Sequence, residues 1–189
     1  MKHLKIIGLA LVAAAALMAF AGSASAATFT APAGTTYTGA LSSSLESGSS
    51  ALLKAGFAEI TCTSSTVAGS ITTNNETEAS GSTSSVAFSS CGSATVTTLS
   101  SKGTLKINKS THAVSGTGTE VTVSLFGTDC VYGMGTGTTL GTATNSASGV
   151  TLAIKTKLPL LSSNSFLCAN PAEWTANYIV TSPTGSVID

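Results

Sequence analysis

The residues that could carry out chemistry in this chain are few, and the first of them is a histidine. His3 lies in a predicted export signal, so His112 is the one histidine left to act as the base of a Ser-His-acid triad. It lies beside a predicted turn, and the sequence has no G-x-S-x-G motif to expose a nucleophilic serine. We therefore interpret His112 as a turn or edge residue and predict a protein without catalytic residues.

One pair of acidic side chains has the potential for acid–base catalysis. Asp129 adjoins Cys130 and Glu173 precedes Trp174, so a disulfide between Cys130 and Cys168 would bring the two carboxylates near each other. Two carboxylates on either side of one bond are the arrangement that hydrolyses glycosides. The other interpretation, which we favour, is that both are turn-capping or surface charges.

The sequence has no pattern of metal ligands or of a cofactor-binding loop. It contains no C-x-x-C pair, no paired histidines after the signal and no D-x-[DN]-x-[DN]-G calcium loop. The run Gly133-Met134-Gly135-Thr136-Gly137 lacks the Gly-Lys-[Ser/Thr] that completes a phosphate-binding loop, and we interpret it as a β-turn. We predict no metal and no cofactor.

Trp174 and Tyr178 are the candidate ligand-binding residues. They lie four residues apart in an alternating segment, so in a strand they share one face. Two aromatic rings exposed on a sheet could stack on a sugar or cover an apolar molecule. Because Trp174 is the sole tryptophan, the core of a small β-domain is the interpretation that we favour.

The first 26 residues have the features of an export signal. Lys2 and Lys5 precede an apolar run, residues 6–20, and Ala24-Ser25-Ala26 fits a cleavage site. The run falls short of the roughly 20 residues that a bilayer span needs, so we expect cleavage and no stable membrane insertion afterwards. The predicted location is secreted, either extracellular or associated with the cell surface.

Export decides how the four cysteines are interpreted. An even number of widely spaced cysteines in an oxidising compartment favours two disulfides. Four cysteines allow three connectivities. We favour Cys62–Cys91 with Cys130–Cys168, because closing the shorter loops costs the least entropy.

Period-two alternation predicts the elements that position these side chains. Apolar and polar residues alternate in residues 104–108, 120–125, 150–155 and 174–180, with turn sequences between them. We predict one all-β domain, an antiparallel β-sandwich of Greek-key or jelly-roll type with two disulfides, over residues 51–189. A signal peptide (1–26) and a Ser/Thr-rich N-terminal arm (27–50) precede it.

The charge of the chain excludes one class of partner. After signal removal, six lysines face eight acidic residues, and the sequence has no arginine. A protein that binds nucleic acid needs clustered Lys and Arg to neutralise phosphates. We therefore expect no nucleic-acid partner.

Five segments carry a resemblance to known proteins. Three of them resemble a group of uncharacterised small secreted actinobacterial β-proteins: Gly127-Thr128-Asp129-Cys130-Val131-Tyr132-Gly133, Cys168-Ala169-Asn170-Pro171-Ala172-Glu173-Trp174-Thr175-Ala176-Asn177-Tyr178 and Val180-Thr181-Ser182-Pro183. This resemblance implies a secreted β-protein and supports pairing Cys130 with Cys168, and it implies no activity. Pro32-Ala33-Gly34-Thr35-Thr36-Tyr37 and Ile60-Thr61-Cys62 are more weakly similar to the secreted alkane-oxidation activator PraB, which implies a surface-associated β-protein.

These observations favour a non-enzymatic protein of the cell surface or extracellular matrix, able to associate with itself or with other surface components. Its low charge offers little electrostatic resistance to strand pairing, and the arm could add as a strand to a neighbour's sheet. The alternative is a β-sandwich module that binds a carbohydrate or small ligand at Trp174 and Tyr178. A glycoside hydrolase using Asp129 and Glu173 is the least favoured function.

Overall fold

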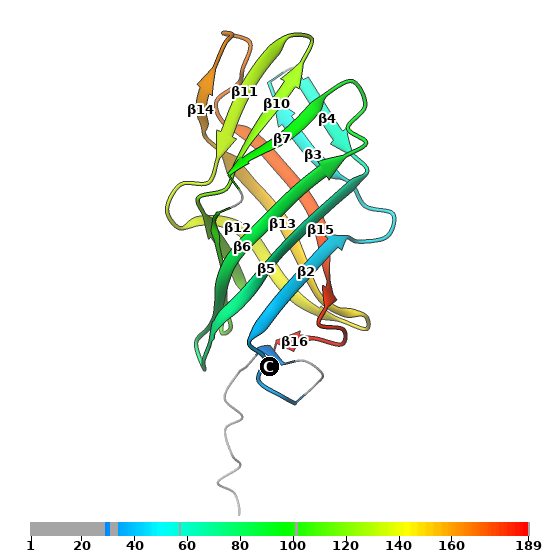
Figure 1. The fold of residues 1–189 in the computed structure, drawn as a ribbon, viewed down its shortest axis with the longest axis vertical. Helices are drawn as coiled ribbons and strands as arrows, with labels where there is room; N and C mark the ends of the chain where they lie inside the picture. Colours follow the sequence, from blue (N-terminus) through cyan, green and yellow to red (C-terminus); the bar gives the residue numbers. More distant parts are fainter. Residues whose placement is uncertain (1–28, 31–33, 57, 101, 189) are drawn as a thin grey trace, which may run out of the picture.

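An eight-stranded antiparallel barrel forms the body of the protein (Figure 1). The structure, a computed structural model, describes residues 29–30, 34–56, 58–100 and 102–188, and among these there is no helix. The barrel strands follow the order β13-β12-β9-β8-β6-β5-β2-β15, and β15 pairs with β13 to close the ring. Their bounds are β2 (Gly39–Leu45), β5 (Ser64–Asn74), β6 (Glu78–Ser89), β8 (Thr104–Asn108), β9 (Ala113–Thr117), β12 (Thr138–Ser146), β13 (Gly149–Leu158) and β15 (Ala172–Ser182).

The all-β class is confirmed, whereas the plain sandwich is wrong, because the main sheet closes on itself. β13 and β15 pair continuously from Thr151–Ile179 to Leu158–Ala172. Closure of a twisted sheet removes the exposed edges that an open sheet would leave. Strands in a sandwich and in a barrel both bury one face, so alternation in the sequence could not distinguish the two.

Beyond one end of the barrel, two layers of strands face each other. The hairpin of β3 (Ala51–Ala55) and β4 (Ala58–Cys62) continues the barrel wall, because β3 pairs with the first part of β15. A separate four-stranded sheet of order β14-β11-β10-β7 forms the other layer (Figure 1). Its strands are β7 (Thr95–Ser100), β10 (Glu120–Leu125), β11 (Thr128–Gly133) and β14 (Leu160–Ser163). Two-layer packing is therefore confined to this end.

The opposite end of the barrel is closed by the two ends of the described chain. β1 (Phe29–Thr30) pairs with β16 (Val187–Ile188), and both Phe29 and Ile188 are buried. Two asparagine side chains pair with this backbone as a neighbouring strand would. Asn74 accepts from Phe29 N (3.1 Å) and donates to Phe29 O (2.7 Å). Asn145 does the same with Ile188, at 2.8 and 2.7 Å.

The predicted N-terminal arm contributes to the barrel itself. Residues 39–45 form β2, which pairs with β5 on one edge and with β15 on the other. This part of the arm therefore completes the protein's own sheet. The predicted signal peptide, residues 1–26, lies outside the described residues.

Both disulfides join the cysteines expected from the sequence. Cys62 at the end of β4 is bonded to Cys91 in the β6–β7 turn, and Cys130 of β11 is bonded to Cys168 in the β14–β15 loop. Two disulfides indicate an oxidising environment outside the cytosol. Within the described ranges, no helix is long and apolar enough to span a membrane.

An aromatic cluster links the barrel core to the two-layer end. Trp174 makes edge contacts with Phe88 and Tyr178, with ring centroids 6.4 and 6.3 Å apart. The Ser65 hydroxyl donates to Ala87 O (2.9 Å), so it accepts the hydrogen bond from the Tyr178 hydroxyl (2.8 Å). Burial raises the pKa of Tyr178 to about 12.

This raised pKa predicts a loss of stability in alkali. In the unfolded chain a tyrosine ionises near pH 10, whereas Tyr178 stays neutral in the folded protein until about pH 12. The contribution of the neutral Tyr178 to the free energy of unfolding is therefore complete below pH 10 and is lost as the pH rises towards 12. Between pH 9 and pH 11 the wild type should lose about 1 kcal/mol more of its free energy of unfolding than Tyr178→Phe.

Urea titrations followed by Trp174 fluorescence at the two pH values measure this difference. Other alkaline titrations, including that of Tyr132, are common to both proteins and cancel. Equal losses in wild type and variant would mean that the Tyr178 hydroxyl is not desolvated in the folded state.

Candidate functional site

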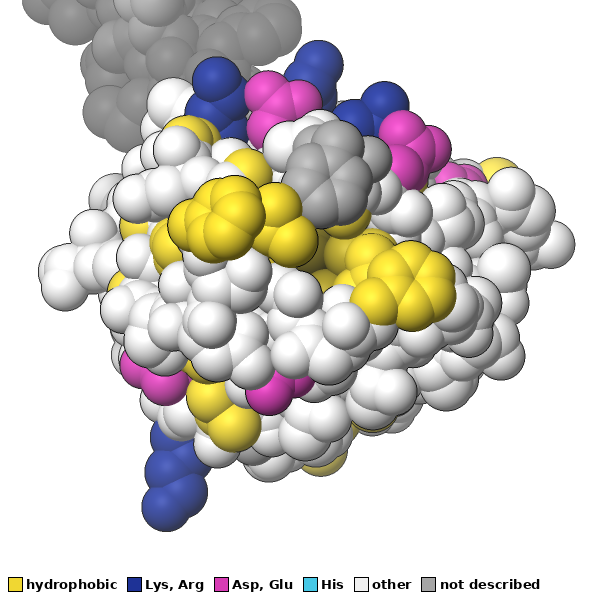
Figure 2. Space-filling view, turned by 90° about the horizontal axis from the view of Figure 1, so that it is seen from above, with side chains coloured by type: hydrophobic (Ala, Val, Ile, Leu, Met, Phe, Trp, Pro, Cys, Tyr) yellow, Lys and Arg dark blue, Asp and Glu magenta, His cyan; other side chains and the backbone are white. Residues whose placement is uncertain are grey.

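An apolar pocket of about 170 Å³ lies at the two-layer end of the molecule. Its walls come from the β3–β4 hairpin, the β10–β11 hairpin and the loop before β15. None of the ten described residues that line it is charged: Ala55, Ala58, Ile60, Val123, Leu125, Phe126, Thr128, Cys130, Tyr132 and Leu167. Figure 2 looks onto this end and shows apolar side chains around a hollow, with charged side chains towards the margins.

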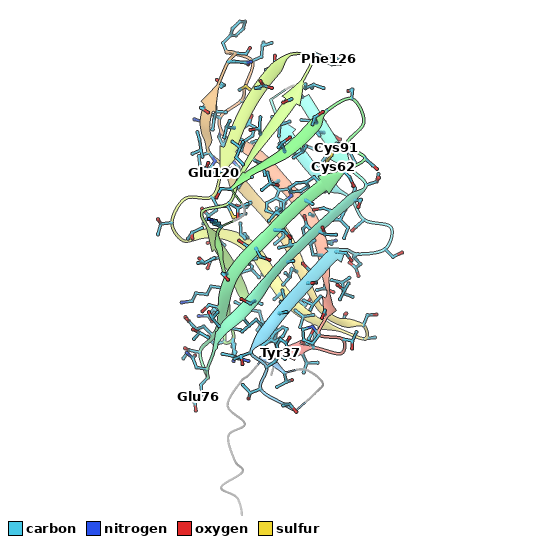
Figure 3. The ribbon with its side chains drawn as sticks, in the orientation of Figure 1. Tyr37, Cys62, Glu76, Cys91, Glu120 and Phe126 are labelled. Carbon is cyan, nitrogen blue, oxygen red and sulfur yellow. A yellow bond between two sulfur atoms is a disulfide. The ribbon has the colours of Figure 1, made fainter. Side chains whose placement is uncertain are left out.

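Phe126 stands at the rim of the pocket, at the tip of the β10–β11 hairpin (Figure 3). Leu125 and Thr128 are the last paired residues, so Phe126 and Gly127 form a two-residue turn in which both have positive φ, 51° and 78°. Such turns favour Asn, Asp or Gly at these positions. A phenylalanine here adopts a costly backbone conformation, and its side chain is 89 % exposed.

The loop between β14 and β15 brings a second apolar group to the same end. Phe166 is 95 % exposed and Leu167 is also exposed, while Cys168 is buried. The loop is turned back on itself by Ser165, whose hydroxyl accepts from Leu167 N at 3.2 Å. Leu167 therefore lines the pocket while its neighbour Phe166 faces solvent.

Asn164 and a disulfide connect the two loops that carry these phenylalanines. The Asn164 side chain accepts from Asp129 N (2.8 Å) and donates to Gly127 O (3.3 Å). The Cys130–Cys168 disulfide joins the same two segments, and the Tyr132 hydroxyl donates to Ala169 O at 3.1 Å. These links connect the loop to the hairpin beside the pocket.

The polar groups of the pocket are few and neutral. Its side-chain hydroxyls are those of Thr128 and Tyr132. Burial raises the pKa of the Tyr132 phenol above its ordinary value, so the hydroxyl remains protonated and can donate to Ala169. Such a lining, as far as the described residues form it, is suited to an uncharged apolar group.

Asp129 and Glu173, the carboxylates considered as a possible acid–base pair, lie on β11 and β15. Both are exposed. Glu173 forms an exposed ion pair with Lys157 (3.7 Å) on the neighbouring strand, and no hydrogen bond connects it to Asp129 within the described residues. Another exposed pair, Lys54–Glu59 (3.1 Å), lies across the β3–β4 hairpin. In the part of the chain that the structure describes, no cluster of His, Cys, Asp and Glu could hold a metal ion.

The remaining predicted site residues lie elsewhere. His112 has a positive φ of 56° in the β8–β9 turn, where its carbonyl accepts from Ala143 N at 2.8 Å. Trp174 and Tyr178 are 8 % and 2 % exposed and belong to the core, which is the position favoured from the sequence. Neither residue is among those that line the pocket at the rim.

Two smaller apolar voids lie deeper in the molecule, and only the first of them shares wall residues with the pocket. The first, of about 40 Å³, shares Ile60, Val123 and Tyr132 with it. The second, of about 50 Å³ in the barrel, shares Trp174 and Met134 with the first. The Trp174 Nε1–H has no hydrogen-bond partner in the described structure, so the indole offers these voids an apolar ring and one unpaired donor.

Comparison with protein-family models, with curated proteins and with solved structures found no match to this chain. The candidate site therefore rests on its own geometry. One feature of the sequence does indicate this site. Leu125-Phe126-Gly127-Thr128 and Ser165-Phe166-Leu167 place large apolar residues in turns, where polar residues are expected.

The role of the Cys130–Cys168 disulfide at the rim can be tested by proteolysis. In Cys130→Ala/Cys168→Ala, the β14–β15 loop loses its covalent attachment to β11, so chymotrypsin should cleave after Phe166 or Leu167 under native conditions much faster than in the wild type. Loss of the disulfide should also reduce stability by about 2–4 kcal/mol.

Cys62→Ala/Cys91→Ala is the matched control. It removes a bond that closes a loop of similar length, 29 against 38 residues, and leaves the rim attached. Mass spectrometry of the fragments identifies the cleavage sites. Equally fast cleavage at Phe166 in both variants would indicate global unfolding and contradict a local role for Cys130–Cys168.

Proposed function

We propose that this protein is a secreted, non-enzymatic binding protein of the cell surface or extracellular matrix, and that it binds an apolar group in the pocket beside Phe126. The observation that carries this proposal is the uncharged pocket of about 170 Å³ with exposed phenylalanines beside it. An engineered apolar cavity of about 150 Å³ stays dry and binds benzene. A pocket of this size can therefore accept a group of about six carbons.

The cost of Phe126 supports a role in binding. Its positive φ disfavours a side chain with a Cβ, and its exposed ring gains no burial in the free protein. The fold does not require phenylalanine at this position, since Asn or Gly would make the same turn more easily. Contact with an apolar ligand would give the ring the burial that the free protein lacks.

The lining of the pocket favours an apolar ligand over a carbohydrate. Sugar recognition uses several polar side chains to pair with hydroxyls, because an unpaired buried hydroxyl is costly. Thr128 and Tyr132 are the described residues of the lining with a side-chain hydroxyl, and that of Tyr132 already donates to Ala169.

Secretion and the absence of enzymatic activity complete the proposal. The signal-like sequence of residues 1–26 and the two disulfides support export to an oxidising compartment. The exposed ion pair of Glu173 with Lys157, the exposure of Asp129 and the turn position of His112 support a binding role without catalysis.

Phe126→Asn tests the function with opposite effects on binding and stability. Asn suits the turn, so the free energy of unfolding should rise by about 1 kcal/mol. Binding of 1-hexanol should weaken about fivefold, as expected for loss of about 1 kcal/mol of apolar contact. Calorimetric titration and urea unfolding measure the two effects.

Leu99→Asn is the control, because Leu99 is an exposed apolar residue of β7 outside the pocket lining. It should leave hexanol binding unchanged and should not stabilise the protein. The proposal is wrong if the wild type binds no hexanol. If the wild type instead self-associates in sedimentation experiments and Phe126→Asn abolishes this, the apolar end is a contact between copies of the chain.

A further inference from the structure

The pocket is the outermost of three apolar voids in series, each of which shares wall residues with the next. Shared wall residues connect the pocket to the first deeper void, and Val86, Thr119, Met134 and Trp174 connect that void to the next. The series therefore runs from the rim, past the buried Tyr132, to the aromatic cluster at the entrance of the barrel.

The sizes of the voids restrict the shape of an occupant. The outer pocket, of about 170 Å³, has space for about six carbons by comparison with benzene. The next void measures about 40 Å³, about a quarter of the outer pocket. A ring or a branched group would not fit there, whereas one or two methylenes of a single chain would.

We infer that the ligand is an unbranched aliphatic chain longer than about six carbons, bound with its tail towards Trp174 and a neutral polar head at the rim. This inference rests on the proposed function and names its ligand class. No charged residue lines the outer pocket, so a charged head would find no partner among the described residues there. The head meets Thr128 and solvent at the rim, while the tail reaches the narrow void only after the outer pocket is filled.

A series of primary alcohols from 1-butanol to 1-decanol tests the depth of the site. If the tail continues past Tyr132, affinity should rise about fourfold with each added carbon, the equivalent of about 0.8 kcal/mol per buried methylene, and should keep rising beyond six carbons. Trp174, the sole tryptophan, should change its emission only with the longer chains. The branched isomer 2-ethyl-1-hexanol should bind more weakly than 1-octanol.

Val96→Ile probes the narrow void directly. Val96 lines this void and not the outer pocket, so one added methyl should leave 1-hexanol binding unchanged and remove the advantage of 1-octanol and 1-decanol over it. Val180→Ile is the matched control, because Val180 lines a further void in the barrel that shares no wall residue with the narrow void or with the outer pocket. It should leave the whole series unchanged.

The outcomes separate this inference from the proposed function. If affinity stops rising at about six carbons and Trp174 emission never changes, the inference is wrong while the apolar pocket stands as a binding site. If no alcohol binds, both are wrong. Even if Val96→Ile fails to fold, the affinities of the alcohol series for the wild type show whether the tail continues into the narrow void.

Discussion

The pairing of β15 with three strands is the constraint on which the rest of the structure depends. β13 follows β15 along one edge, while β2 and β3 divide the other edge between them. The pairing of β15 with β13 closes the barrel. The pairing of β15 with β3 places the β3–β4 hairpin beyond the end of the barrel, opposite the separate four-stranded sheet. Because side chains alternate along a strand, the same register points Trp174, Ala176 and Tyr178 into one core. A shift by one residue would turn all three to solvent.

The two ends of this scaffold differ in physical character. At one end, asparagine side chains complete the hydrogen bonding of β1 and β16, and Phe29 and Ile188 are buried. At the other end, the β10–β11 turn and the β14–β15 loop expose phenylalanines beside an uncharged pocket. A disulfide and Asn164 connect these loops, so the apolar surface is preorganised. Preorganisation lowers the entropy cost of binding, and for this reason we place the function at this end.

The sequence predicted the class of the fold and its covalent links but not its closure or its site. Alternation in residues 120–125 and 174–180 reported strands and their buried faces correctly, because period two depends only on having one face in the core. Closure depends on long-range pairs such as Leu152–Tyr178, which leave no local signal. Cys62–Cys91 and Cys130–Cys168 followed from loop entropy. The pocket does not follow from the strand pattern, because the aromatic residues of the alternating strand, Trp174 and Tyr178, are buried, whereas the exposed ones are Phe126 and Phe166 in turns.

The central claim is that an apolar chain enters the molecule beside Phe126. A crystal structure of the protein grown with 1-octanol tests it most directly, because it locates every carbon of the ligand. The account predicts continuous electron density from a hydroxyl near Thr128 to a tail beyond Tyr132, in contact with the residues around Trp174. An empty pocket, or octanol bound only on the outer surface of the barrel, would contradict it.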